Sequence, residues 1–451
     1  MLLLIVLIQG CRAFTKLSPS AESKLDYSTV TTTLLPRELK LGFIGPTNAD
    51  NTVSQTGGRP ALIAFKLAID DINNRTDLLP NTTLTYVCNN TNSSVGLGII
   101  AASDQIAEHK VIGIVGEYNS LVTQSIQYVA RHYKIPQISY GATSTIFTSD
   151  QSEQYPYFVR TIPDLNSELH ALARFIANQS WHRIALLYGT DRPNFYNVLK
   201  FGNSTREFGV EIVVQRAFVS GESNVDLRYQ FDLIRNSSVR VIVFIGTIKD
   251  QQEVIRNCLL HARDLFSRGY QWIGVHNSMF QELYRNNSND KIILEYHNWT
   301  EGFLGLQNFA DENSEMYRQY KNRFWHSVSN DSDTLTINPT YRDSSVPLIA
   351  NFAYDACFMF AHALHIMIEE LGQDPTLEKH REKYMEVLKK VTFQGVTGNV
   401  SVNEDGDRSA PFDILNFVNG SLVKIGSITA EAKNLSFAQN IPYASKNLFT
   451  R

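Results

Sequence analysis

Short apolar runs and amphipathic segments alternate along most of this chain. The apolar runs predict buried strands at 39–45, 84–88, 111–115, 136–140, 183–188, 210–215, 240–245, 271–274 and 303–306. Apolar residues that recur at steps of three and four predict helices that start at Pro60 and that cover 98–108, 122–132, 169–178, 250–265 and 348–371. Strands that alternate with helices in this way indicate βαβ units and mostly parallel sheets.

The alternation forms two series that meet near Asp164, which favours two α/β lobes over one large sheet. We predict that the chain crosses between the lobes three times, near 161–165, 302–307 and 406–413. The polar stretch 309–345 is expected to include a disordered loop. The predicted parts are a signal peptide (1–13), a linker (14–37), lobe 1 (38–163 plus 306–408), lobe 2 (164–305 plus 409–430) and a C-terminal tail (431–451).

Length and composition agree with this organisation. The 451 residues, 43% hydrophobic and 19% charged, are enough for two domains with substantial cores. The formal net charge of −4 and the lack of a basic stripe give no reason to expect binding to nucleic acid.

The N-terminus resembles a secretory signal. Leu2 to Ile8 is apolar, and the small residues Gly10 and Ala13 follow, although the usual leading Lys or Arg is missing. Two alternatives remain open at this point. The segment is also compatible with a buried strand, and LIQGC resembles a bacterial lipoprotein cleavage box that would make Cys11 a lipid anchor.

A high density of glycosylation sequons argues against a bacterial lipoprotein. It favours a glycosylated, secreted or cell-surface eukaryotic protein. After the N-terminus, no apolar stretch reaches the roughly 18–20 residues that span a bilayer, so we expect a secreted chain or an ectodomain without its anchor. The predicted glycosylation sites are Asn74, Asn81, Asn89, Asn92, Asn178, Asn203, Asn236, Asn286, Asn298, Asn330, Asn399, Asn419 and Asn434.

Signal cleavage near Ala13 would leave the three cysteines Cys88, Cys258 and Cys357. Because three is odd, at least one thiol is free or pairs with another chain. Cys357 is predicted to be a buried, inert thiol in a helix, and Cys88, placed in a surface loop, is the better candidate for a link between chains. None of them has a partner at zinc spacing, so the sequence predicts no metal site and no cofactor.

The chain lacks the motifs that would indicate an enzyme, such as GxSxG, HExxH or a P-loop. Residues Gly96 to Ala101 match the loose dinucleotide pattern GxGxxA, but a loop rather than a strand is expected before them, and the glycines are better read as a helix start. The acidic pairs Asp70-Asp71 and Glu369-Glu370 fall in predicted helices and are interpreted as solvated faces. We therefore expect a binding protein and not an enzyme.

The stretch from Lys134 to Asp164 carries the best candidate site. Ser139, Thr143, Ser144 and Thr145 follow an apolar strand and supply neutral hydrogen-bond donors. Open α/β sheets bind ligands at this end of their strands. The pattern predicts capture of a small polar or carboxylate ligand.

These residues belong to a longer resemblance, which runs from about 39 to 430. In order and spacing, the chain resembles the extracellular ligand-binding region shared by class C G-protein-coupled receptors, natriuretic peptide receptors and ionotropic glutamate receptors, and is most similar to the GABA type B and metabotropic glutamate receptors. The resemblance implies a type I periplasmic binding protein fold, a two-lobed clamshell with three crossovers. Its segments are Gly57-Gly58, AIDDINNRTDLLP, VIGIVG, KIPQISYGATS, YPYFVRTIPD, FAYDACFMFAHAL and FQGVTGNVSVNEDGDR.

The resemblance implies a ligand site built from turns of both lobes. In lobe 1, Ser120 matches a family serine while Leu121 stands where a second serine often lies, and Thr143 keeps its hydroxyl while Gly141 replaces a common serine. In lobe 2, a hinge-facing aromatic maps to Phe195 or Tyr196. The predicted ligand-binding residues are Ser120, Tyr140, Gly141, Ala142, Thr143, Asp164, Phe195, Tyr196, Gly246 and His276.

One departure concerns the ligand's chemistry. An acid that often receives the ammonium of an amino-acid ligand is replaced here by His276, and an imidazole cannot serve as a carboxylate. An ordinary α-amino acid in the usual pose is therefore not expected, and His276 is alternatively a loop residue without a ligand. The resemblance further implies a homo- or heterodimer formed through lobe 1. An alternative function is that of a non-binding dimer partner or of a peptide-binding ectodomain.

Overall fold

The structure is a computed structural model that describes residues 35–47, 57–147, 152–190, 192–246, 248–266, 269–274, 302–330, 345–418, 421–429 and 436–437. The predicted signal peptide with Cys11, and the linker up to residue 34, lie outside the described residues. Within the described ranges, no helix is both long and apolar enough to cross a membrane.

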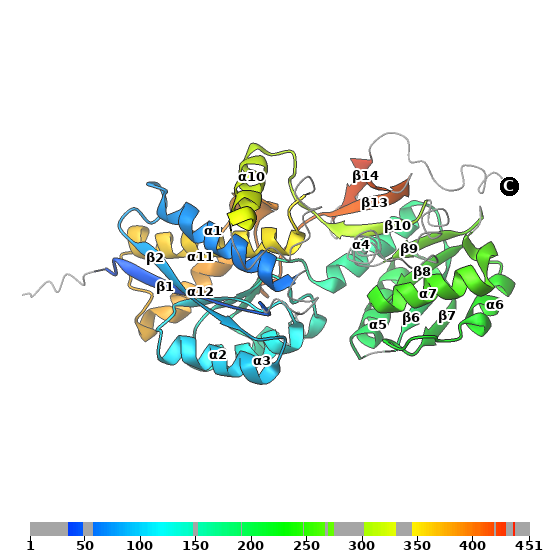
Figure 1. Ribbon diagram of the computed structural model, residues 1–451, viewed down its shortest axis with the longest axis horizontal. Helices are drawn as coiled ribbons and strands as arrows, with labels where there is room; N and C mark the ends of the chain where they lie inside the picture. The colour runs from blue at the N-terminus through cyan, green and yellow to red at the C-terminus, as the bar shows by residue number, and fades with distance from the viewer. Residues whose placement is uncertain are drawn as a thin grey trace, which may run out of the picture. The chain divides into compact units, whose positions relative to one another are not determined.

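The first sheet contains five parallel strands in the order β2-β1-β3-β4-β5 (Figure 1). Side chains alternate across the sheet, so that Phe43 and Ile44 belong to different hydrophobic cores on its two faces. The strands are β1 (Glu38–Gly45), β2 (Thr83–Asn90), β3 (Gly113–Gly116), β4 (Gln137–Ser139) and β5 (Phe158–Arg160).

Helices cover both faces of this sheet. One core joins the sheet to α1 (Arg59–Asn73), α10 (Glu315–Asn330), α11 (Leu348–His365) and α12 (Arg381–Lys390). A smaller core joins the opposite face to α2 (Val95–Ala107) and α3 (Ser120–Ala130). The hairpin of β11 (Phe393–Gly395) and β12 (Gly398–Val400) contributes Phe393 and Val400 to the larger core.

The second sheet has eight strands in the order β15-β14-β13-β10-β9-β8-β6-β7. Its five strands from β10 to β7 run parallel, and β13 to β15 are antiparallel. The strands are β6 (Arg183–Gly189), β7 (Glu211–Phe218), β8 (Val241–Ile245), β9 (Gln271–Gly274), β10 (Leu304–Asn308), β13 (Phe412–Val418), β14 (Ser421–Ile428) and β15 (Ser436–Phe437).

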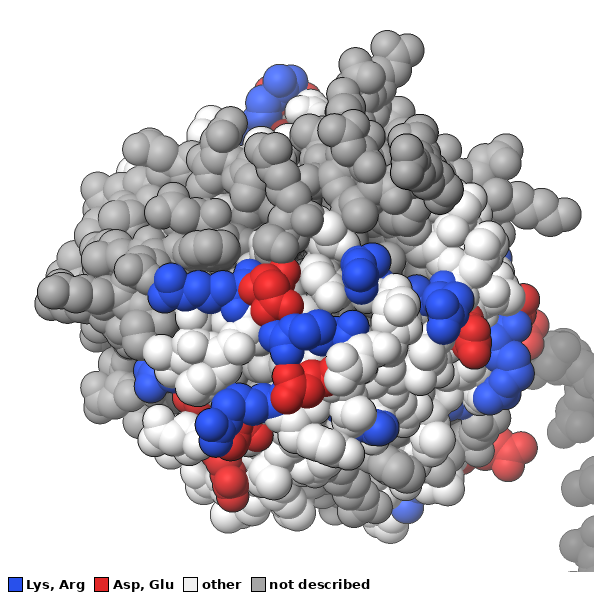
Figure 2. Space-filling model, turned by 90° about the vertical axis from the view of Figure 1, so that its right-hand side faces the viewer, with Lys and Arg blue, Asp and Glu red and all other residues white. Residues whose placement is uncertain are grey.

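This sheet is also covered on both faces. The helices α4 (Leu165–Asn178) and α5 (Arg192–Glu207) pack on one face, and α6 (Arg228–Asn236) and α7 (Ile248–His261) pack on the other. On the face shown in Figure 2, the described Lys and Arg side chains are interspersed with Asp and Glu side chains and form no separate basic or acidic patch. Surface ion pairs of Arg228 with Asp226 and of Arg235 with Asp264 fit this interspersed pattern.

The chain passes between the two sheets three times: from β5 to β6, from β10 to the helices of the first sheet, and from β12 to β13. The predicted α/β class with mostly parallel sheets, flanking helices and three crossovers is thereby confirmed. The lobe boundaries given above stay predictions.

The polar stretch 309–345 contains a helix that was not predicted, α10 at Glu315–Asn330, and residues 331–344 of this stretch lie outside the described residues. Five apolar residues spaced along this helix pack into the larger core of the first sheet, and they are Tyr317, Tyr320, Phe324, Trp325 and Val328. Their recurrence at steps of three and four was the available signal. It was obscured because the intervening positions are almost all polar or charged.

Two local predictions are wrong. Cys88 does not lie in a loop; it is an exposed residue within β2, which extends to Asn90. Asp71 is not on a solvated face, because its side chain is only 10% exposed and pairs with Arg323 and Tyr354. The buried Cys357 in α11 agrees with its prediction.

The glycines between Gly96 and Ala101 lie in α2, as predicted. A Cβ atom at Gly98 would come within 2.6 Å of the Val122 side chain, so this glycine lets α2 and α3 pack closely. Ser94 caps the helix by accepting a hydrogen bond from the Leu97 N–H. The pattern therefore serves helix packing in this chain.

Candidate functional site

The predicted lobe 1 residues lie on two turns at the carboxyl ends of neighbouring strands. The first turn (Gly116–Leu121) follows β3 and the second turn (Tyr140–Thr145) follows β4, and the two strands pair in parallel. This edge of a parallel sheet is where open α/β folds bind ligands. The structure brings five predicted residues together here, and they are Ser120, Tyr140, Gly141, Ala142 and Thr143.

The two turns are joined by a hydrogen bond through Ser120. The Asn119 side chain caps α3 by accepting from the Leu121 N–H at 2.9 Å, which makes Ser120 the first residue of the helix. The Ser120 Oγ accepts a hydrogen bond from the Ser144 N–H of the second turn at 3.3 Å. Ser120 thus helps to hold the second turn in place.

Ser139, expected to offer a donor to the ligand, is used inside the protein instead. Its hydroxyl is fully buried and donates to the carbonyl of Glu117 at 2.7 Å. The same oxygen accepts from the N–H groups of Gly141 (3.2 Å) and Ala142 (2.9 Å). These two amides therefore shape the turn and are not available to a ligand.

Thr143 is the residue of the second turn best placed to meet a ligand. It is half-buried, and its carbonyl accepts from the Leu165 N–H at 2.9 Å. Its hydroxyl makes no hydrogen bond with any other described residue. A hydroxyl that is both a donor and an acceptor, held on a fixed backbone, suits a carboxylate or another small polar group.

The absence of a side chain at Gly141 is explained by the position of Tyr118. A Cβ atom at Gly141 would lie 2.7 Å from the Tyr118 ring and 2.9 Å from the Tyr118 carbonyl oxygen. A Cβ at Gly57 would touch the same ring, at 2.9 Å. The serine that often stands at the position of Gly141 in the family has no room here. Sequence reasoning missed Tyr118, although its place in the first turn was visible.

Tyr140 lies beneath the turn and not at its surface. Its side chain is fully buried and stacks on Phe43, with ring centroids 5.7 Å apart. Burial raises the pKa of Tyr140 well above its usual value, and its hydroxyl has no partner among the described residues. The Tyr140 side chain therefore belongs to the core.

A buried ion pair that the sequence reading missed supports the second turn. Arg160 is fully buried at the end of β5, and its Nε donates to Asp407 at 2.6 Å. Its Nη1 donates to the carbonyls of Ala142 (3.0 Å) and Ser144 (2.9 Å). The signal was an arginine inside the apolar run FVR, where a charge is present only if it is paired.

A buried carboxyl, Glu117, lies in the first turn. It accepts hydrogen bonds from the Thr91 hydroxyl at 2.6 Å and from the Asn119 N–H. Burial raises the pKa of Glu117 to about 7, because these hydrogen bonds only partly offset the loss of solvation. The group titrates close to neutral pH.

Asp164 is the N-cap of α4. Its side chain accepts from the Ser167 N–H at 3.1 Å and from the Ser167 hydroxyl at 2.5 Å, and it is 4% exposed. The adjacent Leu165 N–H bonds to Thr143, so the second turn is tied to the start of this helix. Asp164 therefore positions the crossover next to the turn.

The lobe 2 candidates are described only in part. Tyr196 is exposed on α5. Gly246 directly follows β8 and lies next to Asp250, which accepts from Ser220 and Gly221. Phe195 lies in α5, but its side chain is outside the described residues, as is the whole of His276. Their roles in ligand binding stay predictions.

The chemistry of the two turns is that of binding. It consists of hydroxyls and backbone groups whose geometry is fixed by hydrogen bonds, with Glu117 and the pair of Arg160 and Asp407 buried beside them. Within the described ranges, no cluster of three His, Cys, Asp or Glu side chains is arranged to hold a metal ion.

Comparison with known proteins supports the resemblance seen in the sequence. Residues 60–420 match the family described as the receptor family ligand binding region. The chain is 24% identical to glutamate receptor 3.4 of Arabidopsis thaliana over 80% of its length, and 24% identical to gamma-aminobutyric acid type B receptor subunit 2 of Caenorhabditis elegans over 82%. It is also 24% identical to metabotropic glutamate receptor 4 of Mus musculus over 80%.

The chain spans only 37%, 42% and 45% of these three relatives, respectively. Among solved structures, the leucine binding protein LivK from Thermotoga maritima matches with a TM-score of 0.64 and 18% identity, covering 87% of this chain and 99% of that one. This match confirms the predicted periplasmic binding protein-like fold. The family match, which covers most of the chain, shows that this protein belongs to the receptor family ligand-binding region.

Proposed function

We propose that this chain is the extracellular ligand-binding domain of a class C G-protein-coupled receptor-like protein, related to GABA type B and metabotropic glutamate receptors. It senses a small polar or carboxylate ligand and carries out no catalysis. The observation that carries the proposal is the half-buried Thr143 hydroxyl, which has no partner within the described part of the chain and whose turn is fixed by Arg160 and Ser139.

In the proposed mechanism, the ligand first docks on lobe 1 and lobe 2 then closes about the three crossovers. A ligand that makes additional contacts in the closed form shifts the population toward it. The turn contributes little reorganisation cost, because its backbone is already held by the protein. Closure would transmit the signal to a receptor segment outside this sequence, at the cell surface.

A thermal-shift screen tests the proposal. γ-Aminobutyrate, glutamate, leucine and simple carboxylates are the probes, since the names of the relatives and of LivK point to such molecules. A true ligand at 100 times its Kd should stabilise the protein by about 2.7 kcal/mol. Thr143→Ala should abolish most of this gain, and Thr392→Ala, an exposed threonine, should not change it. Stabilisation by none of the probes, or an undiminished gain in Thr143→Ala, contradicts the small-ligand function.

The dimer expected from the family would form through α2 and α3. Both helices carry exposed apolar side chains, among them Ile100 and Leu121, each 64% exposed. Ile100→Glu should weaken self-association in analytical ultracentrifugation. Leu199→Glu, at a 52% exposed position on α5 of the second sheet, is the matched control and should have no effect. A monomeric wild-type chain would favour a heterodimer.

One observation favours the alternative of a non-binding dimer partner or peptide-binding ectodomain. The Tyr118 ring packs on Gly141, where family members often place a serine. If no small molecule stabilises the protein, and a protein partner binds equally well to wild type and Thr143→Ala, this alternative is the better function.

A further inference from the structure

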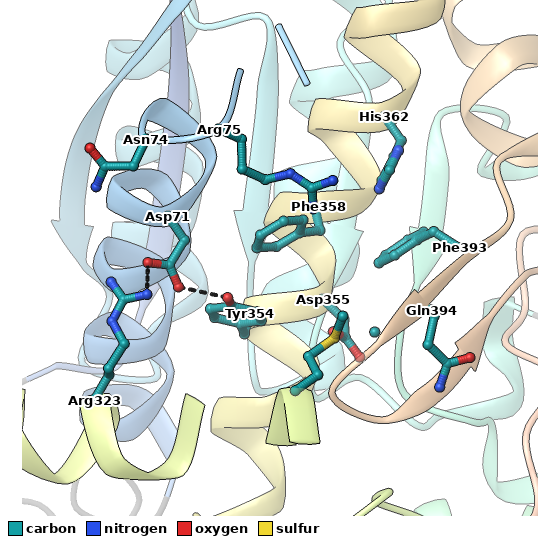
Figure 3. A pocket seen from close by; sticks show the side chains of 12 residues that line it. Asp71, Asn74, Arg75, Arg323, Tyr354, Asp355, Phe358, His362, Phe393 and Gln394 are labelled. Atoms are coloured by element: carbon teal, nitrogen blue, oxygen red, sulfur yellow. Dashed lines mark hydrogen bonds and ion pairs between the residues drawn. The ribbon is translucent and has the colours of Figure 1, made fainter. Parts of the chain in front are cut away.

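A cavity of about 350 Å³ lies between α1, α10, α11 and β11, and none of the ten predicted ligand-binding residues lines it. Figure 3 shows its lining side chains, with Phe358, His362 and Phe393 around a common space and the Arg75 guanidinium at its edge. Its volume is at the lower end of the range, about 300–1,000 Å³, that small-molecule sites occupy. The size suits a compact ligand.

The walls of the cavity are aromatic. Phe393 and His362 stack with ring centroids 4.7 Å apart, and Phe358 packs on Tyr354 at 4.9 Å. Phe358 and Phe393 are 8% and 9% exposed, so their positions are fixed by packing. Flat, apolar walls of this kind favour a ligand with a ring, because aromatic contacts contribute beyond the area that they bury.

The polar edge offers donors. Arg75 donates two hydrogen bonds to Asp77, from Nε at 2.9 Å and from Nη2 at 2.5 Å. The Nη1 atom of Arg75 makes no hydrogen bond with the described residues. Burial, together with Arg75, lowers the pKa of His362 to about 4, so the imidazole is neutral at pH 7. Its ring nitrogens are likewise unused by the described chain. A neutral imidazole can donate one hydrogen bond and accept another.

The acidic side chains that line the cavity are already engaged. Asp71 pairs with Arg323 and accepts from the Tyr354 hydroxyl at 2.7 Å, as the dashed lines in Figure 3 show. Asp355 is fully buried and accepts from the N–H groups of Val396 (2.9 Å) and Thr397 (3.0 Å). A cationic ligand would have to compete with these partners, whereas an acceptor can use the idle donors of Arg75.

We propose that this cavity is a second small-molecule site, which binds a planar aromatic ligand carrying a hydrogen-bond-accepting group such as a carboxylate. The ring lies between Phe358 and Phe393, and the acceptor faces Arg75 and His362. The site is separate from the two turns and does not depend on the function proposed for them.

Titration calorimetry and saturation-transfer NMR on the full chain test this site. The probes are benzoate, benzamide and benzylamine, which share a ring and differ in the attached group. Benzoate should bind in the millimolar range or tighter, benzamide somewhat more weakly, and benzylamine at least about tenfold more weakly than benzoate, because charge-assisted bonds to Arg75 are the stronger ones. Absence of benzoate binding, or a preference for benzylamine, overturns the proposal.

Two variants locate the binding. Met316 lies at the mouth of the cavity and is 41% exposed, so Met316→Trp should fill the space without disturbing the core and should abolish benzoate binding. Leu371→Trp, at a 42% exposed position outside the cavity, is the matched control and should bind like the wild type. Equal binding by Met316→Trp, with an unchanged melting temperature, would refute the site.

Arg75→Met tests the polar edge. It should lower the affinity for benzoate about tenfold and that for benzamide less, because the carboxylate loses an ion pair with the guanidinium as well as a hydrogen bond. Equal losses for both probes would contradict the role given to Arg75. Loss of benzoate binding in Thr143→Ala, with binding by Met316→Trp unchanged, would place the benzoate at the turns and would overturn the cavity site.

Discussion

The two neighbouring turns of lobe 1 are each supported by a buried ionisable side chain, and these two side chains differ in their partners. The first turn is supported by Glu117, a carboxyl that accepts from uncharged donors. The second is supported by Arg160, whose charge is matched by Asp407 and whose remaining bonds go to turn carbonyls. Because one support is an acid without a cationic partner and the other is an ion pair, we expect them to respond differently to mutation. Burial raises the pKa of both carboxyls, that of Glu117 to about 7 and that of Asp407 to about 6.

The largest effect should follow from breaking the support of the second turn. Arg160→Met leaves Asp407, whose side chain is 7% exposed, buried and unpaired, and should lower the free energy of unfolding by about 3–5 kcal/mol. The double variant Arg160→Met/Asp407→Leu removes both charges and should recover most of this loss in urea unfolding.

The same pair of variants separates stability from the order of the turn. Even in the stable double variant, the carbonyls of Ala142 and Ser144 lose their donor, so amides at 141–145 should exchange faster with deuterium than in the wild type. Wild-type exchange in the double variant would show that Arg160 serves stability alone.

The pH dependence of stability tests the burial of Glu117 in the first turn. Below pH 4.5 the Glu117 carboxyl is protonated in both states, while between pH 4.5 and 7 only the unfolded chain loses the proton. The group therefore lowers the free energy of unfolding as the pH rises through this window, by up to about 3 kcal/mol. Glu117→Gln cannot titrate, so the difference between the two unfolding curves should grow between pH 4.5 and 7 and stay constant above pH 7.

Other titrating groups are common to wild type and variant and cancel in that difference. A difference that does not change with pH would mean that Glu117 is charged in the folded protein at pH 5. The folded protein would then stabilise the Glu117 carboxylate, and the contrast with the ion pair of Arg160 and Asp407 would be lost.

A smaller effect is expected where the two turns touch. Gly141→Ser restores the residue common in the family, but its Cβ would overlap the Tyr118 ring, at a cost of about 1–3 kcal/mol. Tyr118→Ala should relieve the overlap with the ring, so the double variant should be more stable than the sum of the two single changes predicts. Additive losses in double-mutant thermal unfolding would contradict a role of the ring and would leave the Tyr118 backbone, whose Cα and carbonyl oxygen lie 2.8 and 2.9 Å from such a Cβ, as the source of the overlap.

The sequence predicted most of the sheet and its crossovers because buried parallel strands are nearly continuous apolar runs. The strand at 271–274 was predicted with the bounds that the structure has. The helix α10 was missed because a half-buried helix needs only one apolar residue per turn, and its charged positions dominate the composition. Cys88 was misplaced because the strand predicted at 84–88 was expected to end there, beside two sequons, whereas β2 continues to Asn90.

The sequence predicted where in the fold the candidate site lies, but not the hydrogen bonds that its side chains make. Turns after β3 and β4 follow from the strand pattern, but the partner of each hydroxyl depends on residues distant in sequence. The Ser139 hydroxyl points inward because it donates to the carbonyl of Glu117. Arg160 pairs with Asp407, which lies almost 250 positions later in the chain. The aromatic cavity is equally non-local, since it joins Arg75, just after α1, to His362 of α11 and Phe393 of β11.

Capture of the ligand by the second turn can be tested by hydrogen–deuterium exchange, measured with and without a probe that stabilises the protein in the thermal-shift screen. We expect slower exchange for the amides at 141–145 in the presence of that probe. Protection confined to the cavity residues around 354–362 and 393–395, with no change at 141–145, would contradict it.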